Sequence, residues 1–115
     1  MSHHNLLEPI PPGEILREDF MEPLGISINH LARNIGVPPN RISEIVNGKR
    51  AVTADSALRL QRFFGVEAQF WLNLQSEYDL RMAKRQKWPE IERTIIPIKP
   101  KISGPTADKG VALIS

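Results

Sequence analysis

Apolar residues recur at helical intervals through most of this chain, in short blocks separated by glycine and proline. One block shows the pattern clearly: Ile28, Leu31, Ala32 and Ile35 share one face of a helix that ends at Gly36. Blocks of this kind predict helices at residues 13–22, 28–35, 39–46, 54–64 and 67–86. Nothing between residues 13 and 86 favours a strand, so the predicted fold is all-α with five helices.

Local signals mark the ends of these helices. Ser27 and Thr53 stand at N-cap positions, where a side-chain oxygen accepts a backbone N–H of the first turn. Pro39 suits the first position of a helix, because the N–H that it lacks has no partner there. Gly36 and Gly65 suit the left-handed residue that commonly follows a helix. We therefore expect short helices joined by tight turns.

The two ends of the chain differ from its centre. Residues 1–12 contain three prolines and predict an extended N-terminal arm. After Trp88-Pro89 the helical pattern stops, and the β-branched residues 94–98 are compatible with a short edge strand. Turn-forming residues beyond position 100 predict a flexible C-terminal tail. The predicted organisation is an arm at 1–12, a domain at 13–88 and a tail at 89–115.

Residues 31–45 meet the requirements of a helix-turn-helix unit. Ala32 is the small residue needed where the two helices approach, and Gly36 is the turn residue that can adopt a positive φ. The apolar residues that brace the angle between the helices are Leu31, Ile35, Val37, Ile42 and Ile45. Because such a unit places its second helix in the DNA major groove, the pattern favours DNA binding over a purely structural hairpin.

Charge agrees with this location only when it is divided along the chain. The whole chain has 115 residues, 41% of them hydrophobic and 24% charged, with a net charge of +2, as in an ordinary single globular domain. Residues 29–65 carry six basic and two acidic residues, whereas residues 1–28 carry one basic and five acidic. A basic central third suits a polyanionic partner. On charge alone, a mixed solvated surface remains the alternative.

Several function classes lack the residues that they need. The chain has no cysteine, which excludes disulfides, cysteine zinc ligands and thiol catalysis. His3, His4 and His30 do not have metal-binding spacing, and there is no glycine-rich phosphate loop. No apolar run approaches the roughly 20 residues that span a bilayer, and the N-terminus lacks a signal pattern. We expect a cytoplasmic protein without membrane contact, catalytic site, metal or cofactor.

Residues 10–86 also resemble the HigA (VapI-like) antitoxins of the Xre/Cro helix-turn-helix family. The matching segments are Pro12–Leu16, Leu24–Ser27, Asn40–Ser43, Asn47–Arg50, Ala57–Leu60, Phe70–Gln75 and Tyr78–Leu80. One departure is Pro12, where family members often carry histidine. The resemblance implies a lambda repressor-like fold and an antitoxin that represses its own operon. It also implies a HigB-like partner, a RelE-like mRNA-cleaving toxin that the antitoxin neutralises.

The candidate DNA-binding residues follow from placing residues 39–47 in a major groove. Asn40 suits adenine, Arg41 suits guanine or a phosphate, and Glu44 suits cytosine. The start of the first motif helix suits a phosphate, as do the loop cations after the second helix. The full set is Ser27, Asn29, Pro39, Asn40, Arg41, Ser43, Glu44, Asn47, Lys49 and Arg50. We expect Arg33, Arg59 and Arg62 to be surface charges, and Phe70, Trp71, Leu74 and Tyr78 to form core.

One short recognition helix reads only a few base pairs, so we expect a homodimer on double-stranded DNA with a palindromic operator. The dimer surface is expected on the long fifth helix and the segment after it. The toxin is expected to dock away from Asn40–Asn47. Two alternatives remain: a solitary Xre-type repressor without a toxin, and a protein-binding module that has lost DNA binding. The basic residues beside an intact motif, Arg41, Lys49 and Arg50, argue against the second.

Overall fold

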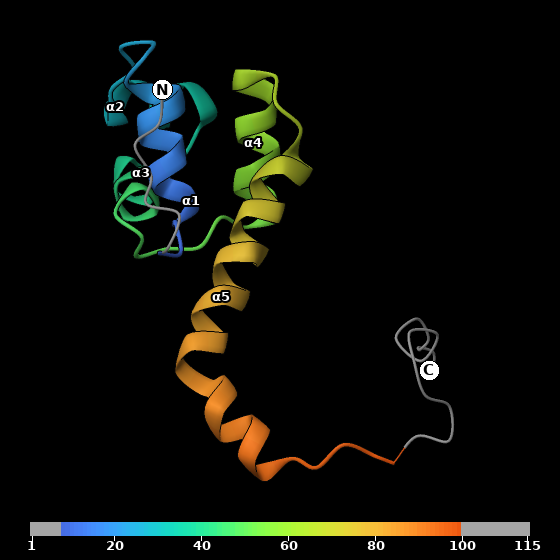
Figure 1. Cartoon of the computed structure of the whole chain (residues 1–115). Helices are drawn as coiled ribbons and strands as arrows, with labels where there is room; N and C mark the ends of the chain where they lie inside the picture. Colours follow the sequence, from blue (N-terminus) through green and yellow to red (C-terminus); the bar gives the residue numbers. More distant parts are fainter. Residues whose placement is uncertain (1–7, 100–115) are drawn as a thin grey trace.

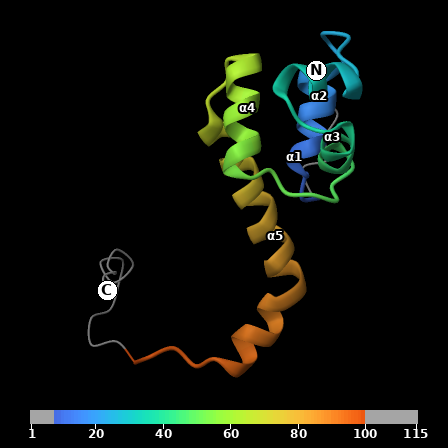
Figure 2. The same cartoon turned by 180° about the vertical axis from the view of Figure 1, so that it is seen from behind.

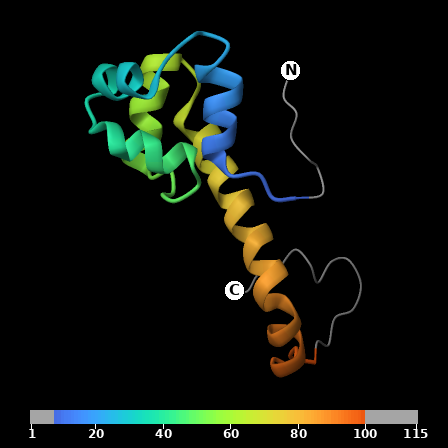
Figure 3. The same ribbon diagram turned by 90° about the vertical axis from the view of Figure 1, so that its left-hand side faces the viewer.

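The computed structural model describes residues 8–99 and divides them into a globular part and a projecting helix (Figure 1). The globular part contains α1 (Pro12–Ile15) with its π-helical continuation η1 (Leu16–Met21), α2 (Ile28–Ile35), α3 (Pro39–Val46) and α4 (Ala54–Phe64). The helix α5 (Ala68–Thr94) begins against α4 and then leaves the globular part (Figure 3). Because α1 and η1 are continuous, this is the predicted five-helix, all-α fold, with no strand in the described range.

The predictions for the two ends of the chain concern residues outside the described range. They are the expected extended conformation of residues 1–7, with His3 and His4, and the expected tail beyond residue 99. The inner part of the arm is described and is fastened to the projecting helix. Arg85 of α5 lies 2.8 Å from Glu8, an ion pair between exposed side chains that are 77 positions apart in the sequence.

The predicted caps are present. The Oγ atom of Ser27 accepts the N–H of His30 at 3.0 Å, and Oγ1 of Thr53 accepts the N–H of Ser56 at 3.3 Å. Gly36 and Gly65 follow their helices with φ of 73° and 82°. A further cap was not anticipated: the Gln61 side chain of α4 accepts the N–H of Ala68 at 2.7 Å and so starts α5.

The core lies where α1, α2, α3, α4 and the first turns of α5 meet. Trp71 of α5 is fully buried and packs on Phe20 with ring centroids 4.8 Å apart. The residues predicted to brace the helix pair are all buried, and Ala32 between them has no exposed surface. The core expectation therefore holds for Trp71 but not for Phe70, which is 37% exposed at the edge of the cluster, while Leu74 and Tyr78 are half-buried.

The contact between α1 and α3 is unusually close. At Gly13, an added Cβ would lie 1.7 Å from the carbonyl oxygen of Ile45 and 2.7 Å from Cα of Val46. No side chain fits there, because all of the atoms that it would meet belong to the backbone. The position of α3 in the globular part is therefore set by the bare backbone of α1.

Two predictions for the C-terminal part are wrong. The helix predicted at 67–86 continues through Pro89 to Thr94, and the strand considered at 94–98 does not form in the described chain. Proline removes one helical hydrogen bond, but this part of α5 is exposed all round, so water can solvate the freed carbonyl. Ile95 is extended, yet no neighbouring strand is available among the described residues.

Candidate nucleic-acid interface

The outward face of α3 carries four polar side chains. Helical periodicity places them opposite the three buried residues, Ile42, Ile45 and Val46. We call these four the outward strip: Asn40, Ser43, Glu44 and Asn47. Asn47 donates its side-chain N–H to the Ser43 carbonyl at 2.8 Å, which extends the polar face one residue past the helix end.

The beginnings of α2 and α3 enclose one open hollow. Five of the residues predicted to contact DNA line it, together with Ile28; they are Ser27, Asn29, Pro39, Asn40 and Ser43. Two separate helices thus bring half of the predicted set to one place. The Ser27 hydroxyl already serves as the α2 cap, so its local role is confirmed. In Figures 1 and 2, α3 and α4 lie on opposite sides of α1.

The loop after α3 presents the two predicted cations differently. Arg50 donates through Nε to Glu44 Oε1 at 2.7 Å, so this pair of predicted residues is joined at the edge of the outward strip. Lys49 is exposed and has no ion-pair partner among residues 8–99. Lys49 can therefore meet an incoming anion directly, whereas Arg50 must first leave Glu44.

A side chain of α5 holds this loop in place. Gln75 of α5 accepts the backbone N–H of Val52 at 2.8 Å and donates to Asp79 at 2.9 Å. Its contact links residues 23 positions apart, which no local pattern in the sequence signals. The loop with Lys49 and Arg50 is therefore anchored to the inner half of α5.

Arg41 does not lie on the outward strip. Its Nη1 atom donates to Oδ2 of Asp55, at the start of α4, at 3.1 Å. The same oxygen accepts Nε of Arg59 at 2.9 Å, and Arg59 Nη1 reaches the carbonyl of Ile35 at 2.8 Å. Hydrogen bonds from Arg59, and then from Arg41, hold the pKa of Asp55 below its ordinary value despite partial desolvation. The carboxylate is therefore charged at neutral pH.

Arg59, expected to be an ordinary surface charge, thus connects α4 to the end of α2. Arg33 and Arg62 are exposed, as expected. Residues 8–99 contain no group of three histidine, cysteine or acidic side chains that could hold a metal ion. None of the described helices combines the length and the apolar character needed to cross a membrane.

Comparisons with known proteins agree with this geometry. The helix-turn-helix family model matches residues 18–71. The chain is 53% identical over 83 residues to virulence-associated protein I of Dichelobacter nodosus, covering 72% of this chain and 77% of that protein. It is similar to a solved HigA-family addiction module antidote protein from Coxiella burnetii, with 46% sequence identity and a TM-score of 0.75. That match covers 79% of this chain and 99% of that protein. It is also similar to the Pseudomonas aeruginosa antitoxin HigA, solved with the higBA promoter, with 44% sequence identity and a TM-score of 0.78. That match covers 80% of this chain and 100% of that protein.

Proposed function

Because this chain belongs to the Xre-type helix-turn-helix family that includes the HigA antitoxins, we propose that it is a DNA-binding antitoxin that represses its own operon. The observation that carries the proposal is the hollow between the beginnings of α2 and α3. Five predicted DNA-contacting residues line it, and two of them, Asn40 and Ser43, belong to the outward strip. This face is the one that a helix-turn-helix unit turns toward the major groove. We assign it no catalytic role and place the protein in the cytoplasm, beside its operator.

The residues divide into base-reading and phosphate-binding groups. Asn40 has the chemistry to pair with adenine, and Ser43, Glu44 and Asn47 continue along the groove, with Pro39 beside them. Lys49 and Arg50 in the loop, and the start of α2 at Ser27 and Asn29, suit the phosphate backbone. Phosphate contacts supply affinity without sequence information, so operator recognition rests on the outward strip.

We propose that α5 makes the chain a homodimer. α5 carries a stripe of exposed apolar residues, Leu80, Trp88 and Ile91, and exposed Ile95 follows directly after the helix. The spacings of eight and three residues place Leu80, Trp88 and Ile91 on one face of α5. The occupant that suits this stripe is the same stripe of a second copy, because a two-fold protein matches a palindromic operator. The outer end of α5 lies away from α2 and α3, at the other end of the molecule (Figure 2).

The toxin partner is proposed from the family alone. We expect a HigB-like, RelE-like mRNA-cleaving toxin that contacts this chain outside the outward strip, so that the complex still binds the operator. A solitary repressor is the alternative. A short reading frame immediately upstream in the same operon, whose product co-purifies with this chain, favours the antitoxin role. The absence of such a frame favours the solitary repressor.

The primary test is a footprint of the full chain on its own promoter at two salt concentrations. We expect a protected palindrome whose half-sites lie about one or two helical turns apart, at about 34 Å a turn. Asn40→Ala should cost about 1–3 kcal/mol of operator binding and relax the base preference at one position. Lys49→Ala should instead weaken binding to all sequences and lower the log–log salt slope by about one.

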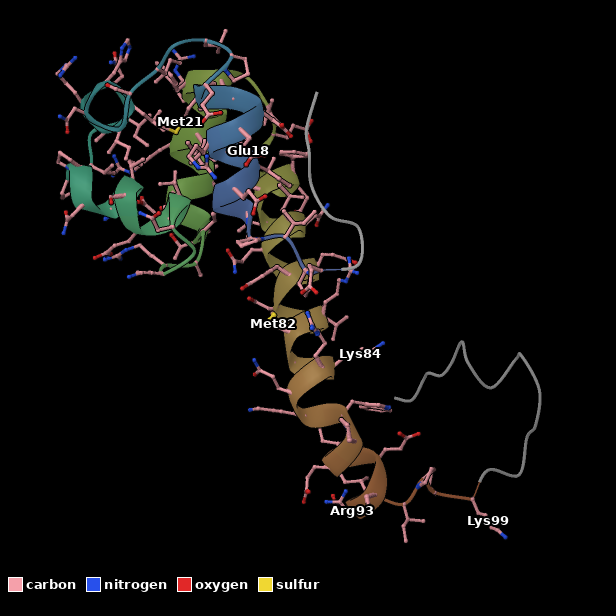
Figure 4. All side chains as sticks on the ribbon, turned by 60° about the vertical axis from the view of Figure 1, so that its left-hand side comes forward. Glu18, Met21, Met82, Lys84, Arg93 and Lys99 are labelled. Carbon is pink, nitrogen blue, oxygen red and sulfur yellow. The ribbon has the colours of Figure 1, made fainter. Side chains whose placement is uncertain are left out.

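Lys84→Ala is the matched control for Lys49→Ala. It removes an exposed lysine from the outer half of α5, where the side chain points away from the helix (Figure 4), and should leave the footprint unchanged. If the wild-type chain protects no site, alone or with its co-expressed partner, then the proposed function is wrong. If it protects a site but Asn40→Ala and Lys49→Ala both bind normally, then only the assignment of the interface is wrong.

A further inference from the structure

Arg41 is the only basic residue of the recognition helix α3, and its guanidinium lies against α4. One residue earlier, Asn40 points outward into the hollow. The 100° between successive helical residues turns Arg41 toward the flank of α3 that faces Asp55. Its side chain is 31% exposed, so it lies at the rim of the interface and is not buried beneath it.

Asp55 cannot follow Arg41 if that arginine turns toward DNA, because Asp55 is itself held. Arg59 donates Nε to the same carboxylate oxygen at 2.9 Å. The other end of the Arg59 guanidinium is fixed by the carbonyls of Ile35 at 2.8 Å and Gly36 at 3.4 Å. A chain of contacts therefore runs from the end of α2 through Arg59 and Asp55 to Arg41. Arg41 is its only member on the recognition helix.

A free arginine at this rim would act on all DNA alike. A guanidinium beside the groove contacts the nearest phosphate, and such a contact raises affinity for every sequence. Selectivity, however, depends on the ratio of operator binding to binding elsewhere. Such a phosphate contact lowers that ratio when it contributes more to binding at non-operator sites than at the operator. Few base contacts compete with it at non-operator sites.

We propose that Asp55 is a specificity-determining residue that holds Arg41 against α4 and away from the DNA backbone. The inference rests on the proposed function, because it concerns how the same interface discriminates between sequences. Operator recognition then falls to the outward strip, while the one cation of the recognition helix is kept in an internal ion pair. Arg59 acts as a positioning residue for the Asp55 carboxylate.

The test is a double-mutant cycle on the full chain with Asp55→Asn, Arg41→Gln and the two changes together. Affinity is measured for the operator and for a scrambled duplex of equal length over a series of salt concentrations. We expect Asp55→Asn to raise affinity for the scrambled duplex several-fold at low salt and to steepen its log–log salt slope by about one. In the Arg41→Gln background, the same change should have no effect on the scrambled duplex.

Two further variants test whether the effect is a general loss of negative charge and whether Arg59 positions Asp55. Glu77→Gln removes an exposed carboxylate on α5 and should not raise scrambled-duplex binding. Arg59→Gln removes the side chain that holds the Asp55 carboxylate in place and should raise scrambled-duplex binding part of the way toward the Asp55→Asn value. Thermal melts establish that each variant is folded at the assay temperature.

Three outcomes overturn the inference. In the first, Asp55→Asn raises scrambled-duplex binding equally with and without Arg41, which indicates a general charge effect. In the second, the Asp55→Asn variant is folded but binds both duplexes more weakly, which indicates that Asp55 presents Arg41 to DNA. In the third, Asp55→Asn leaves the ratio of operator affinity to scrambled-duplex affinity unchanged. Each of these requires a wild-type chain that binds its operator, whereas a wild-type chain that binds no operator contradicts the proposed function itself.

Discussion

Gly13 lies where α1 meets the backbone of α3, and its lack of a side chain determines how closely these helices approach. The sequence shows Gly13 after a pair of prolines, where it reads as the start of a helix. Only the structure shows that the carbonyl of Ile45 occupies the space of a Cβ. The residue therefore acts on the recognition helix from 32 positions away in the sequence.

We predict that Gly13→Ala lowers the free energy of unfolding by about 3 kcal/mol, the upper end for an overpacked site, because backbone must move on both sides. Operator affinity should fall with it, since α3 is displaced. Gly25→Ala is the matched control: Gly25 has a φ of +65° and no neighbour within 4 Å. It should cost about 1–2 kcal/mol through backbone strain alone and leave α3 in place. Urea unfolding of both variants measures the difference, and equal stability of Gly13→Ala and wild type would contradict the packing argument.

Residues differ in how far the sequence alone predicts their roles. Ser27 and Thr53 were predictable as caps because a cap bonds to a backbone N–H three residues later. Gln75 and Arg59 were not, because each contacts backbone more than 20 positions away. An exposed arginine also has the same local pattern whether it is solvated or paired. The position of Arg41 was therefore predictable only to the helix and not to its flank.

At the scale of elements, the pair α2 and α3 is the part that the sequence predicts best. All of its predicted apolar positions are buried except Ile28, which is half-buried, because burial on a short amphipathic helix follows directly from periodicity. The end of α5 is the part that it predicts worst. A proline usually ends a helix, but its cost depends on whether the freed carbonyl meets water, and the exposure of Pro89 is a tertiary property.

Ala32 tests the packing of this pair. Its Cβ is fully buried between the helices, so Ala32→Leu should force them apart and lower the unfolding free energy by about 1–3 kcal/mol. Operator affinity should fall as the angle of α3 changes. Ala54→Leu makes the same substitution at an exposed position in the first turn of α4 and should affect neither property. Denaturant unfolding and a footprint together check this, and a stable, DNA-competent Ala32→Leu variant would refute it.

At the scale of the molecule, the helices form a body with a long projection, extending 57 Å along its longest axis. Figure 4 shows Met21 within the globular part, whereas Met82, Lys84 and Arg93 lie along the projecting helix. The sequence predicted that α5 is long but not that half of it has no core to cover. In the proposed dimer, a second copy covers this part of the helix.

We predict that Ile91→Glu shifts the proposed dimer to monomer, because it places a carboxylate in the centre of the apolar stripe. Gln86→Glu is the matched control, since it adds the same charge on the opposite face of α5. Sedimentation equilibrium of the two variants gives the oligomeric state, and footprints give the consequence for the operator. The dimer assignment fails if Ile91→Glu sediments like wild type, or if wild type is itself monomeric at footprinting concentrations.

The exposed outer half of α5 also has a consequence for how long the protein survives. Residues 83–94 have no buried side chain, and an isolated helix of this length is marginal in water. Its amides should therefore exchange with solvent far faster than those around Trp71, and the same local opening admits proteases. A bound second chain suppresses that opening in proportion to its concentration. We therefore expect the lifetime of the chain in the cell to increase with the fraction of it that is assembled in the proposed dimer.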